Sequence, residues 1–416
     1  MIEKTLLGKT PYGGKIFYLS SDKAYEIPAI RIFVSTQRPI KALVKEPISS
    51  TEDLIEYINK HPEIAKPYVK KILKFFHGDI GEMGRDALYF KSVSRLFTFE
   101  SWVPVGATRG IKGVGTELSL RYVKAKDFID LKNEKIKRIN EESTKLYQEL
   151  REDKVPKEDA RYVLPLTAKT EEIIQIQLGR DLAKWASYLK KRPFKEAKAA
   201  GETILSWNEA ENGFFSPQEE IPDSKIPLFK KDESLERKSK EKFLKKIHYN
   251  PLTQSLIWFS NRSISSFHQD VRNRQVYFWW PSWESALEDE EFYFPLTLPE
   301  EKREKFKEHC ISLLEVSRKF WKKKEFELAV ISLPLAKRLK VFSAIYGNRN
   351  IYETIRLRTC LRAQLEIRSQ YQLIASLIKK DFPGELGPRC QTEGICFEPF
   401  KEKCPLYSRY VRKTNN

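Results

Sequence analysis

Hydrophobic positions recur at helical spacing towards the C-terminal end of the chain. Ala363, Ile367, Tyr371, Ile374 and Ile378 follow each other at steps of three and four. This spacing places one stripe of a helix against a core. The charged stretch 347–368 continues into the stripe, so we predict one long helix there. Arg358, Arg362 and Glu366 then share a different face of that helix.

Other patterns predict the remaining elements. The Ser-Ser-Thr-Glu-Asp run at 49–53 is typical of a capped helix start, because serine or threonine before acidic residues accepts from free amides. Helices are also expected over residues 66–76 and 127–153. Strands are predicted over 30–35 and 96–102, and a glycine-rich loop over 108–122.

A Leu-Pro-Leu motif occurs twice, around Pro165 and Pro334. Pro165 lies fifteen residues before Arg180, and Pro334 lies fifteen residues before Arg349. After each proline we expect a helix-like segment and then a glycine step into another helix. Aromatic strands at 97–99 and 257–259 also precede cationic loops in both parts. We infer a tandem duplication that forms a fused pseudo-dimer rather than a solenoid.

Composition sets the domain plan. The 416 residues are too many for one ordinary domain, and 41% are hydrophobic. A charged, proline-containing segment separates the repeats, which gives a first half (1–206), a linker (207–242), a second half (243–383) and a cysteine-containing tail (384–416). The N-terminus lacks a secretory apolar region, and no apolar run approaches the roughly 18 to 20 residues of a membrane span. We therefore expect a cytoplasmic protein that does not bind membranes.

The formal charge of +18 favours polyanionic ligands. Five arginines lie within 347–368, and planar guanidinium groups suit carboxylate, phosphate or an ionised heterocycle. This stretch is either the wall of an anion site or a solvated face of Arg/Glu pairs. A basic nucleic-acid-binding protein is a further alternative, in which the aromatic run 277–280 stacks bases or packs in the core.

Several motifs resemble the flavin-dependent thymidylate synthases, also called thymidylate synthase complementing proteins. Residues 268–274 (HQDVRNR) resemble the family's H-Q-x-V-R-H-R run, with Asn273 for histidine. Residues 116–122 (TELSLRY) resemble its E-x-S-x-R-Y tail. Residues 160–165 (ARYVLP) match A-R-x-x-L-P, and 363–368 (AQLEIR) match the last motif. Each half keeps motifs that the other lacks.

The resemblance implies an α+β fold of two related halves, with one composite site between the halves of the chain. In that family, dUMP is methylated to dTMP with methylenetetrahydrofolate as carbon donor and NADPH as electron donor, and FAD carries the hydride. The matching arginine, Arg358, is implied as the catalytic cation that stabilises the ionised uracil ring. The implied dUMP-binding residues are Arg109, Glu117, Leu118, Ser119, Leu120, Arg121, Arg161, Gln269, Arg272 and Arg358. The implied FAD-binding residues are Asn250, Arg272, Asn273, Arg274, Asn348, Arg349 and Glu353.

The resemblance also implies a homodimer of chains that mimics the family's tetramer. A catalytically degenerate relative that binds nucleotide or flavin, or acts as a structural partner, is the alternative within the same fold.

Three cysteines follow the second half. Cys390, Cys396 and Cys404 are spaced C-x5-C-x7-C, and Pro405 follows the last. Such a group suggests zinc or an iron–sulfur cluster, with Cys360 or Cys310 as a fourth ligand. Disulfides or buried thiols are the alternative.

Overall fold

The computed structural model describes residues 1–38, 43–44, 46–73, 82–106, 110–125, 127–212, 247–279, 282–396, 398 and 401–411. Arg109, Trp280 and residues 213–242 of the predicted linker lie outside this part. The chain forms two compact units, of which unit 1 holds 1–105, 110–222 and 294–336. Unit 2 holds 106–109, 223–293 and 337–416. Residues 294–336, which follow the linker in sequence, therefore pack in unit 1.

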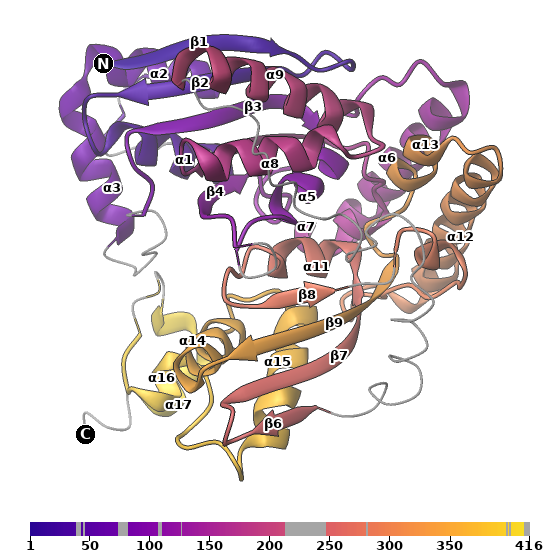
Figure 1. The fold of residues 1–416 in the computed structure, drawn as a ribbon. Coiled ribbons are helices and arrows are strands. Elements are labelled where there is room, and N and C mark those ends of the chain that lie inside the picture. Colours follow the sequence, from indigo (N-terminus) through magenta and orange to yellow (C-terminus); the bar gives the residue numbers. More distant parts are fainter. Residues whose placement is uncertain are drawn as a thin grey trace. The chain divides into compact units, whose positions relative to one another are not determined.

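An antiparallel sheet in the order β1-β2-β3-β5-β4 forms the centre of unit 1 (Figure 1). Its strands are β1 (Ile2–Lys9), β2 (Lys15–Ser21), β3 (Asp86–Ser94), β4 (Gly113–Glu117) and β5 (Lys169–Ile176). The helices are α1 (Glu26–Thr36), α2 (Thr51–Lys60), α3 (Ala65–Leu73), α5 (Arg95–Trp102), α6 (Glu134–Glu152), α7 (Lys157–Ala160), α8 (Arg180–Lys190), α9 (Lys195–Asn212), α12 (Glu300–Lys322) and α13 (Phe326–Ile331), with short 3-10 turns η1 (Pro62–Ile64) and η2 (Arg161–Val163).

Alternating side chains cover the two faces of this sheet. Phe17 and Tyr89 point into the core formed with α1, α2 and α3. Their neighbours Tyr18 and Phe90 point to the opposite face. There, Tyr18 packs on Trp207 of α9, and Phe90 packs on Trp185 of α8.

Two strand predictions in this unit are wrong. Residues 30–35 lie in α1 and residues 96–102 lie in α5. Every residue from Glu26 to Val34 is buried, and so is all of α5. A helix buried on all sides has no polar face, so its sequence lacks the 3.6-residue period that marks amphipathic helices. The capped helix start is confirmed, because Ser50 and Asp53 form a capping box at α2.

Unit 2 is built on a second antiparallel sheet, in the order β6-β7-β9-β8 (Figure 1). The strands are β6 (His248–Asn250), β7 (Ser255–Ser263), β8 (Tyr277–Trp279) and β9 (Arg338–Tyr346). The helices are α11 (Ile264–Asp270), α14 (Asn348–Arg358), α15 (Leu365–Ile378), α16 (Arg389–Thr392) and α17 (Pro405–Tyr410), with turns η5 (Ser285–Leu287) and η6 (Lys401–Lys403). The two antiparallel sheets and their helices confirm the α+β class.

The long helix predicted over 347–368 is in fact two helices. α14 ends at Arg358, and α15 begins at Leu365. The Thr359 hydroxyl donates to the Ile355 carbonyl at 2.7 Å, and Gln364 is extended (φ −54°, ψ 140°), so the helical path is interrupted between them. The predicted stripe is buried from Ile367 onward, whereas Ala363 precedes α15. Arg358, Arg362 and Glu366 therefore do not share one helical face.

The aromatic run on β8 packs within unit 2. Tyr277 and Trp279 stack at 6.0 Å, and they contact Tyr346 and Phe342 of β9. Phe278 is buried against Phe267. These described residues support packing in the sheet rather than an exposed base-stacking platform.

The repeat is visible in equivalent elements. Ser94 and Ser263 each end a strand and cap a buried helix, α5 and α11. Gly179 and Gly347 each precede a helix with φ of 84° and 86°, a conformation that glycine adopts without strain. The helix predicted after each proline is wrong, because strands β5 and β9 occupy those positions. The aromatic landmark is also wrong, because 97–99 lies on α5 whereas 257–259 lies on β7.

The two Leu-Pro-Leu motifs pair with each other inside unit 1. The Leu335 amide donates to the Leu164 carbonyl at 2.9 Å, and the Leu166 amide donates to the Leu333 carbonyl at 3.3 Å. Each motif thus makes the same contact to the other, as across a twofold interface. The equivalent helices α6 and α12 also pack together around Ile139 and Leu313. This local pairing is what a fused dimer predicts.

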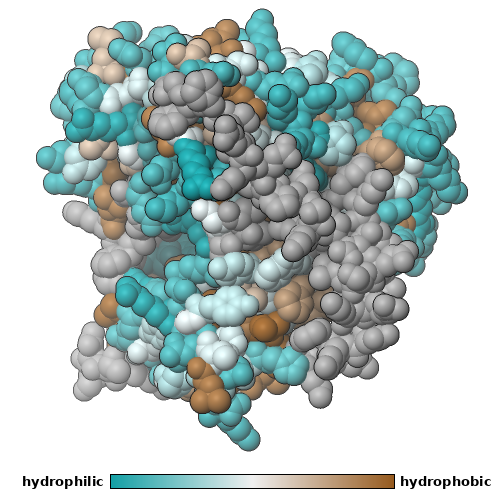
Figure 2. Space-filling view, in the orientation of Figure 1, coloured by the Kyte–Doolittle hydropathy of each residue, from teal (hydrophilic) through white to brown (hydrophobic). Residues whose placement is uncertain are grey.

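Hydrophilic residues cover most of the coloured surface on the face shown in Figure 2, and hydrophobic ones occur there in small groups. Within the described ranges, we find no helix that is both long and apolar enough to span a membrane.

Candidate functional site

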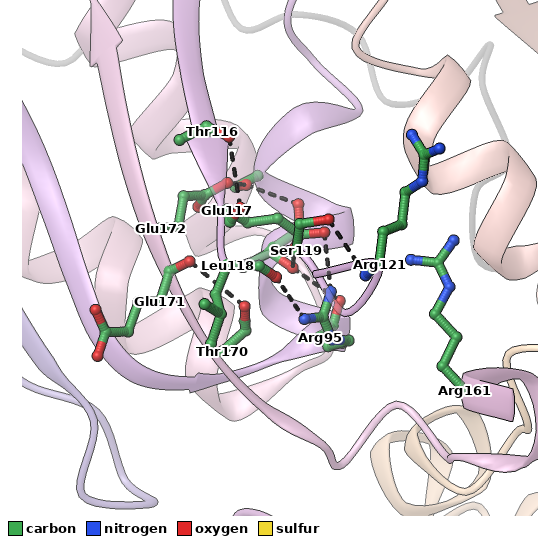
Figure 3. Close-up of polar contacts among 12 residues, drawn as sticks. Arg95, Thr116, Glu117, Leu118, Ser119, Arg121, Arg161, Thr170, Glu171 and Glu172 are labelled. Atoms are coloured by element: carbon green, nitrogen blue, oxygen red, sulfur yellow. Dashed lines mark hydrogen bonds and ion pairs between the residues drawn. The ribbon is translucent and has the colours of Figure 1, made fainter. Parts of the chain in front are cut away.

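A buried ion pair fixes the end of β4. Glu117 accepts from Arg95 at 2.9 Å and from Thr98 at 2.7 Å, and both charged side chains are buried (Figure 3). Arg95 also donates to the Leu118 carbonyl at 2.6 Å. A buried charge of this kind is stable only with its partner in place. Glu117 and Leu118 therefore hold the loop that follows.

That loop is shaped by its backbone. The Ser119 amide donates to the Ser35 carbonyl at 3.0 Å, and the amides of Tyr122 and Val123 donate to the Ser119 carbonyl at 3.0 Å each. The Arg121 amide lies 3.3 Å from the Ser119 hydroxyl. Leu120 is buried, so it anchors the loop while its neighbours reach the surface of unit 1.

Arg121 and Arg161 lie next to each other and extend in the same direction (Figure 3). Arg121 Nε donates to Glu158 at 2.7 Å, and Arg161 Nε donates to the Glu158 carbonyl at 3.1 Å. Burial, together with the positive charges of Arg121 and Arg95, lowers the pKa of Arg161 to about 10. An anion bound here would offset this crowding of cations.

Lys157 extends the same basic group. Its amine donates to the Tyr122 carbonyl at 2.9 Å. Burial lowers the pKa of Lys157, and so do the charges of Arg38, Arg151 and Lys124. The sequence analysis did not select Arg95 or Lys157. The available signal for Arg95 was a cation placed directly after a serine cap, at the start of a run rich in aromatic residues.

A buried carboxylate organises the candidate residues of unit 2. Asp270, at the end of α11, is fully buried and accepts from Arg262 and from the Tyr371 hydroxyl, the latter at 2.8 Å. Arg358 Nε lies 3.0 Å from its other oxygen, and the Arg358 side chain is 23% exposed. Burial and the Asp270 charge raise the pKa of Tyr371. Arg358 is thus tethered at its inner edge while part of its guanidinium stays accessible. Sequence analysis missed Asp270, although it lies inside the recognised 268–274 motif.

The turn after α11 carries the predicted flavin residues. Arg272 is half-buried and Arg274 is exposed. Gln269, predicted to bind dUMP, lies on α11 and is half-buried. The Asn273 side-chain amide donates to the Thr354 hydroxyl at 3.2 Å, so it ties this turn to α14.

The remaining predicted flavin residues lie on β6 and α14. Asn250 accepts from the amides of Leu252 and Thr253 at 2.9 and 3.2 Å, which forms a turn. Asn348 accepts from the Tyr249 hydroxyl at 2.8 Å, and Arg349 beside it is exposed. Glu353 pairs with Arg356 on the same helix. Asn250 and Glu353 therefore have internal structural roles.

The candidates form two groups, one in each unit. Unit 1 brings together Glu117, Leu118, Ser119, Leu120, Arg121 and Arg161. Unit 2 brings together Gln269, Arg272, Asn273, Arg274 and Arg358 around the end of α11, and Asn250, Asn348, Arg349 and Glu353 around the start of α14. That both groups serve one composite site stays a prediction. Two surface hollows, one between α6 and α12 and one along residues 127–144, contain none of these residues.

The fold and its repeated elements define a duplicated α+β protein with a group of arginines in each unit. The chain belongs to the thymidylate synthase complementing protein family, which it matches twice, over residues 29–206 and 190–384. The double match confirms both the resemblance and the tandem duplication. A search of curated proteins gave no match.

Proposed function

We propose that the chain is an FAD-dependent thymidylate synthase that methylates dUMP to dTMP with methylenetetrahydrofolate and NADPH. Its membership of the family supports this chemistry. The observation that carries the proposal for this chain is the pairing of Arg121 with the buried Arg161, because such crowded cations favour a ligand with about two negative charges, such as a nucleotide monophosphate.

The phosphate of dUMP would bind at the loop after β4. Ser119 offers a hydroxyl, and Arg121 and Arg161 offer guanidinium groups. These are the donors that phosphate recognition uses. Glu117 would act through Arg95, by holding the loop in place.

Arg358 would stabilise the uracil ring when that ring carries negative charge. Arginine is too basic to accept a proton near neutral pH, so its role is electrostatic. Its Nε lies at the buried Asp270 carboxylate, which fixes the direction of the guanidinium before substrate binds. A cation fixed in this way needs no reorganisation as charge develops.

Some of the candidate residues of unit 2 suit the negatively charged phosphates of FAD. Arg272, Arg274 and Arg349 supply positive charge, and Asn348 starts α14, whose N-terminal end favours phosphate. Asn273 would position this turn through Thr354 rather than contact the cofactor. Bound flavin would supply the hydride, and the protein would bind, orient and screen the reactants.

The test is an assay of the purified full-length chain with dUMP, methylenetetrahydrofolate, NADPH and FAD, with nucleotide products separated by chromatography. We expect dTMP that disappears when either FAD or the folate is omitted. Protein that binds FAD and dUMP but forms no dTMP under anaerobic and aerobic conditions would contradict the proposal.

A further inference from the structure

Four of the five cysteines lie in unit 2, on segments that meet near the end of α14. Cys360 follows α14 by two residues, and Cys390 lies on α16. Cys396 follows α16, and Cys404 caps α17. All four thiols are free, and Cys390 is buried while the others are half-buried.

Polar contacts bring these segments together. The Tyr352 hydroxyl of α14 lies 3.1 Å from both Thr392 and Glu393, which follow Cys390 by two and three residues. Arg356 pairs with Glu393 at 2.5 Å. Arg362, two residues after Cys360, lies 3.5 Å from Glu398, two residues after Cys396.

Helix packing brings in the fourth cysteine. α16 packs against α17, whose N-terminal residue follows Cys404. The turn after α14 and the three tail cysteines therefore occupy one region of unit 2.

Cys310 does not belong to this group. It lies on α12 in unit 1, fully buried among Phe306, Leu313 and Leu314 on the inner side of that helix. Burial alone raises the pKa of its thiol. The structure thus separates the two cysteines that the sequence left as alternatives for a fourth ligand.

We propose that Cys360, Cys390, Cys396 and Cys404 ligate an iron–sulfur cluster of the four-iron type. The spacing lacks the close cysteine pairs of common zinc sites, and a proline follows the last cysteine as in bacterial ferredoxin motifs. Arg362, Arg389 and Lys401 carry positive charge on the same segments and would offset the thiolates.

Across the described residues, no group of three or more His, Cys, Asp or Glu side chains is arranged to hold a metal ion. Formation of the cluster would therefore require the four cysteine side chains to move closer together.

The cluster would have a structural consequence for Arg358. Cys360 lies two residues beyond Arg358, so ligation at Cys360 would fix the end of α14 and the turn into α15. The role assigned to the cluster is this anchoring, and no electron transfer is required of it.

The experiment measures iron and acid-labile sulfide in the full-length chain purified without oxygen, independently of any activity. We expect about four of each per chain and broad visible absorbance that dithionite bleaches. Flavin released by acid is measured separately, so that its absorbance is subtracted. About one zinc per chain without sulfide would overturn the cluster. A chain that stays metal-free after incubation with ferrous iron and sulfide would overturn the site.

Variants assign the ligands. Cys360→Ala and Cys404→Ala should lose most of the iron, whereas Cys310→Ala, the matched control outside the group, should keep it. Retention of the full iron content by Cys360→Ala would overturn the assignment of Cys360. Alkylation of the wild-type chain covers the case in which a variant does not fold: Cys360, Cys396 and Cys404 should become labelled only after oxidative loss of the cluster.

Discussion

Each group of candidate arginines rests on a buried carboxylate. Glu117 holds Arg95 under the loop of Arg121, and Asp270 holds the inner edge of Arg358. Both carboxylates have more than one donor, so each arginine is fixed by a network rather than by a single pair. At the scale of single residues we make three predictions.

Arg358→Ala should reduce dTMP formation by about a hundredfold or more, because a preorganised charge in a site is worth that much in rate. The fold should persist, since Asp270 keeps Arg262 and Tyr371 as partners. Steady-state kinetics and circular dichroism measure the two effects. Arg138→Ala removes an exposed arginine of α6 and serves as the control. Wild-type turnover in Arg358→Ala would remove the residue from the mechanism.

Arg161→Gln should weaken dUMP binding by roughly tenfold or more, because it removes a charge-assisted contact to phosphate. Calorimetric titration with dUMP and with deoxyuridine separates the phosphate contribution. The variant and the wild type should bind deoxyuridine equally. A variant that loses affinity equally for both ligands would show that Arg161 does not contact the phosphate.

Asp270→Asn should destabilise the chain by about 3–5 kcal/mol, because it leaves the buried Arg262 without its counter-charge. Denaturant unfolding measures the loss. Asp130→Asn, which alters an exposed pair with Lys132, should leave the free energy of unfolding unchanged. Equal stability of the two variants would show that the Asp270 network is not structural.

At the scale of elements, both repeats contain the same contact, in which a glutamate binds the serine at the corner between a strand and a helix. Ser94 donates through its amide and hydroxyl to Glu196 of α9, at 3.0 and 2.5 Å. Ser263 donates in the same way to Glu366 of α15, at 2.8 and 2.6 Å. Each glutamate thereby locks the strand-to-helix corner that carries a candidate group. The sequence analysis assigned no role to Glu366 of the A-Q-x-E-I motif. In the structure this residue holds the corner between β7 and α11.

The contact between Glu196 and Ser94 in unit 1 should make the stability of the chain depend on pH. Burial raises the pKa of Glu196 to about 7, and the nearby Glu327 raises it too, while Ser94 and Thr10 oppose the shift. The folded state then holds a proton that the unfolded state releases above about pH 4.5. The contribution of Glu196 to the free energy of unfolding is therefore complete below about pH 4.5. Between that pH and about pH 7 it declines by about 1.4 kcal/mol per pH unit.

Glu196→Gln should remove this decline, which denaturant unfolding between pH 5 and pH 8 would reveal. Glu134→Gln, at the start of α6, is the surface control. An unchanged pH profile in Glu196→Gln would show that Glu196 is ionised throughout in the folded chain.

Sequence patterns predicted some elements and not others, for physical reasons. The amphipathic helices α2 and α15 could be predicted from the sequence because one face of each is exposed to water and the other is buried. The buried α1 and α5 were mistaken for strands because neither has a polar face exposed to water; their charged residues, such as Arg31 and Glu100, are buried too. The break after Arg358 was missed because Thr359–Gln364 contains no glycine or proline. Local patterns also cannot show which carboxylate pairs with which arginine, so Asp270 and Arg95 emerged only from the fold.

At the scale of the whole molecule, the duplication explains the divided motifs. The chain carries both partners of a twofold interface, seen in the pairing of Leu164 with Leu335 and of Leu166 with Leu333. Once both copies are fused, each half is free to lose residues that the other supplies. Unit 1 keeps the loop after β4 and Arg161, whereas unit 2 keeps Arg358 and the basic turn after α11.

The central claim is that this divided chain still binds flavin for work on dUMP. The most direct measurement is fluorescence of the supernatant after the purified chain is denatured and removed, with FAD identified by chromatography. We expect close to one FAD per polypeptide. We also expect the absorbance spectrum of the bound flavin to shift when dUMP is added. A chain that contains no FAD, and whose addition leaves the spectrum of free FAD unchanged, would contradict it.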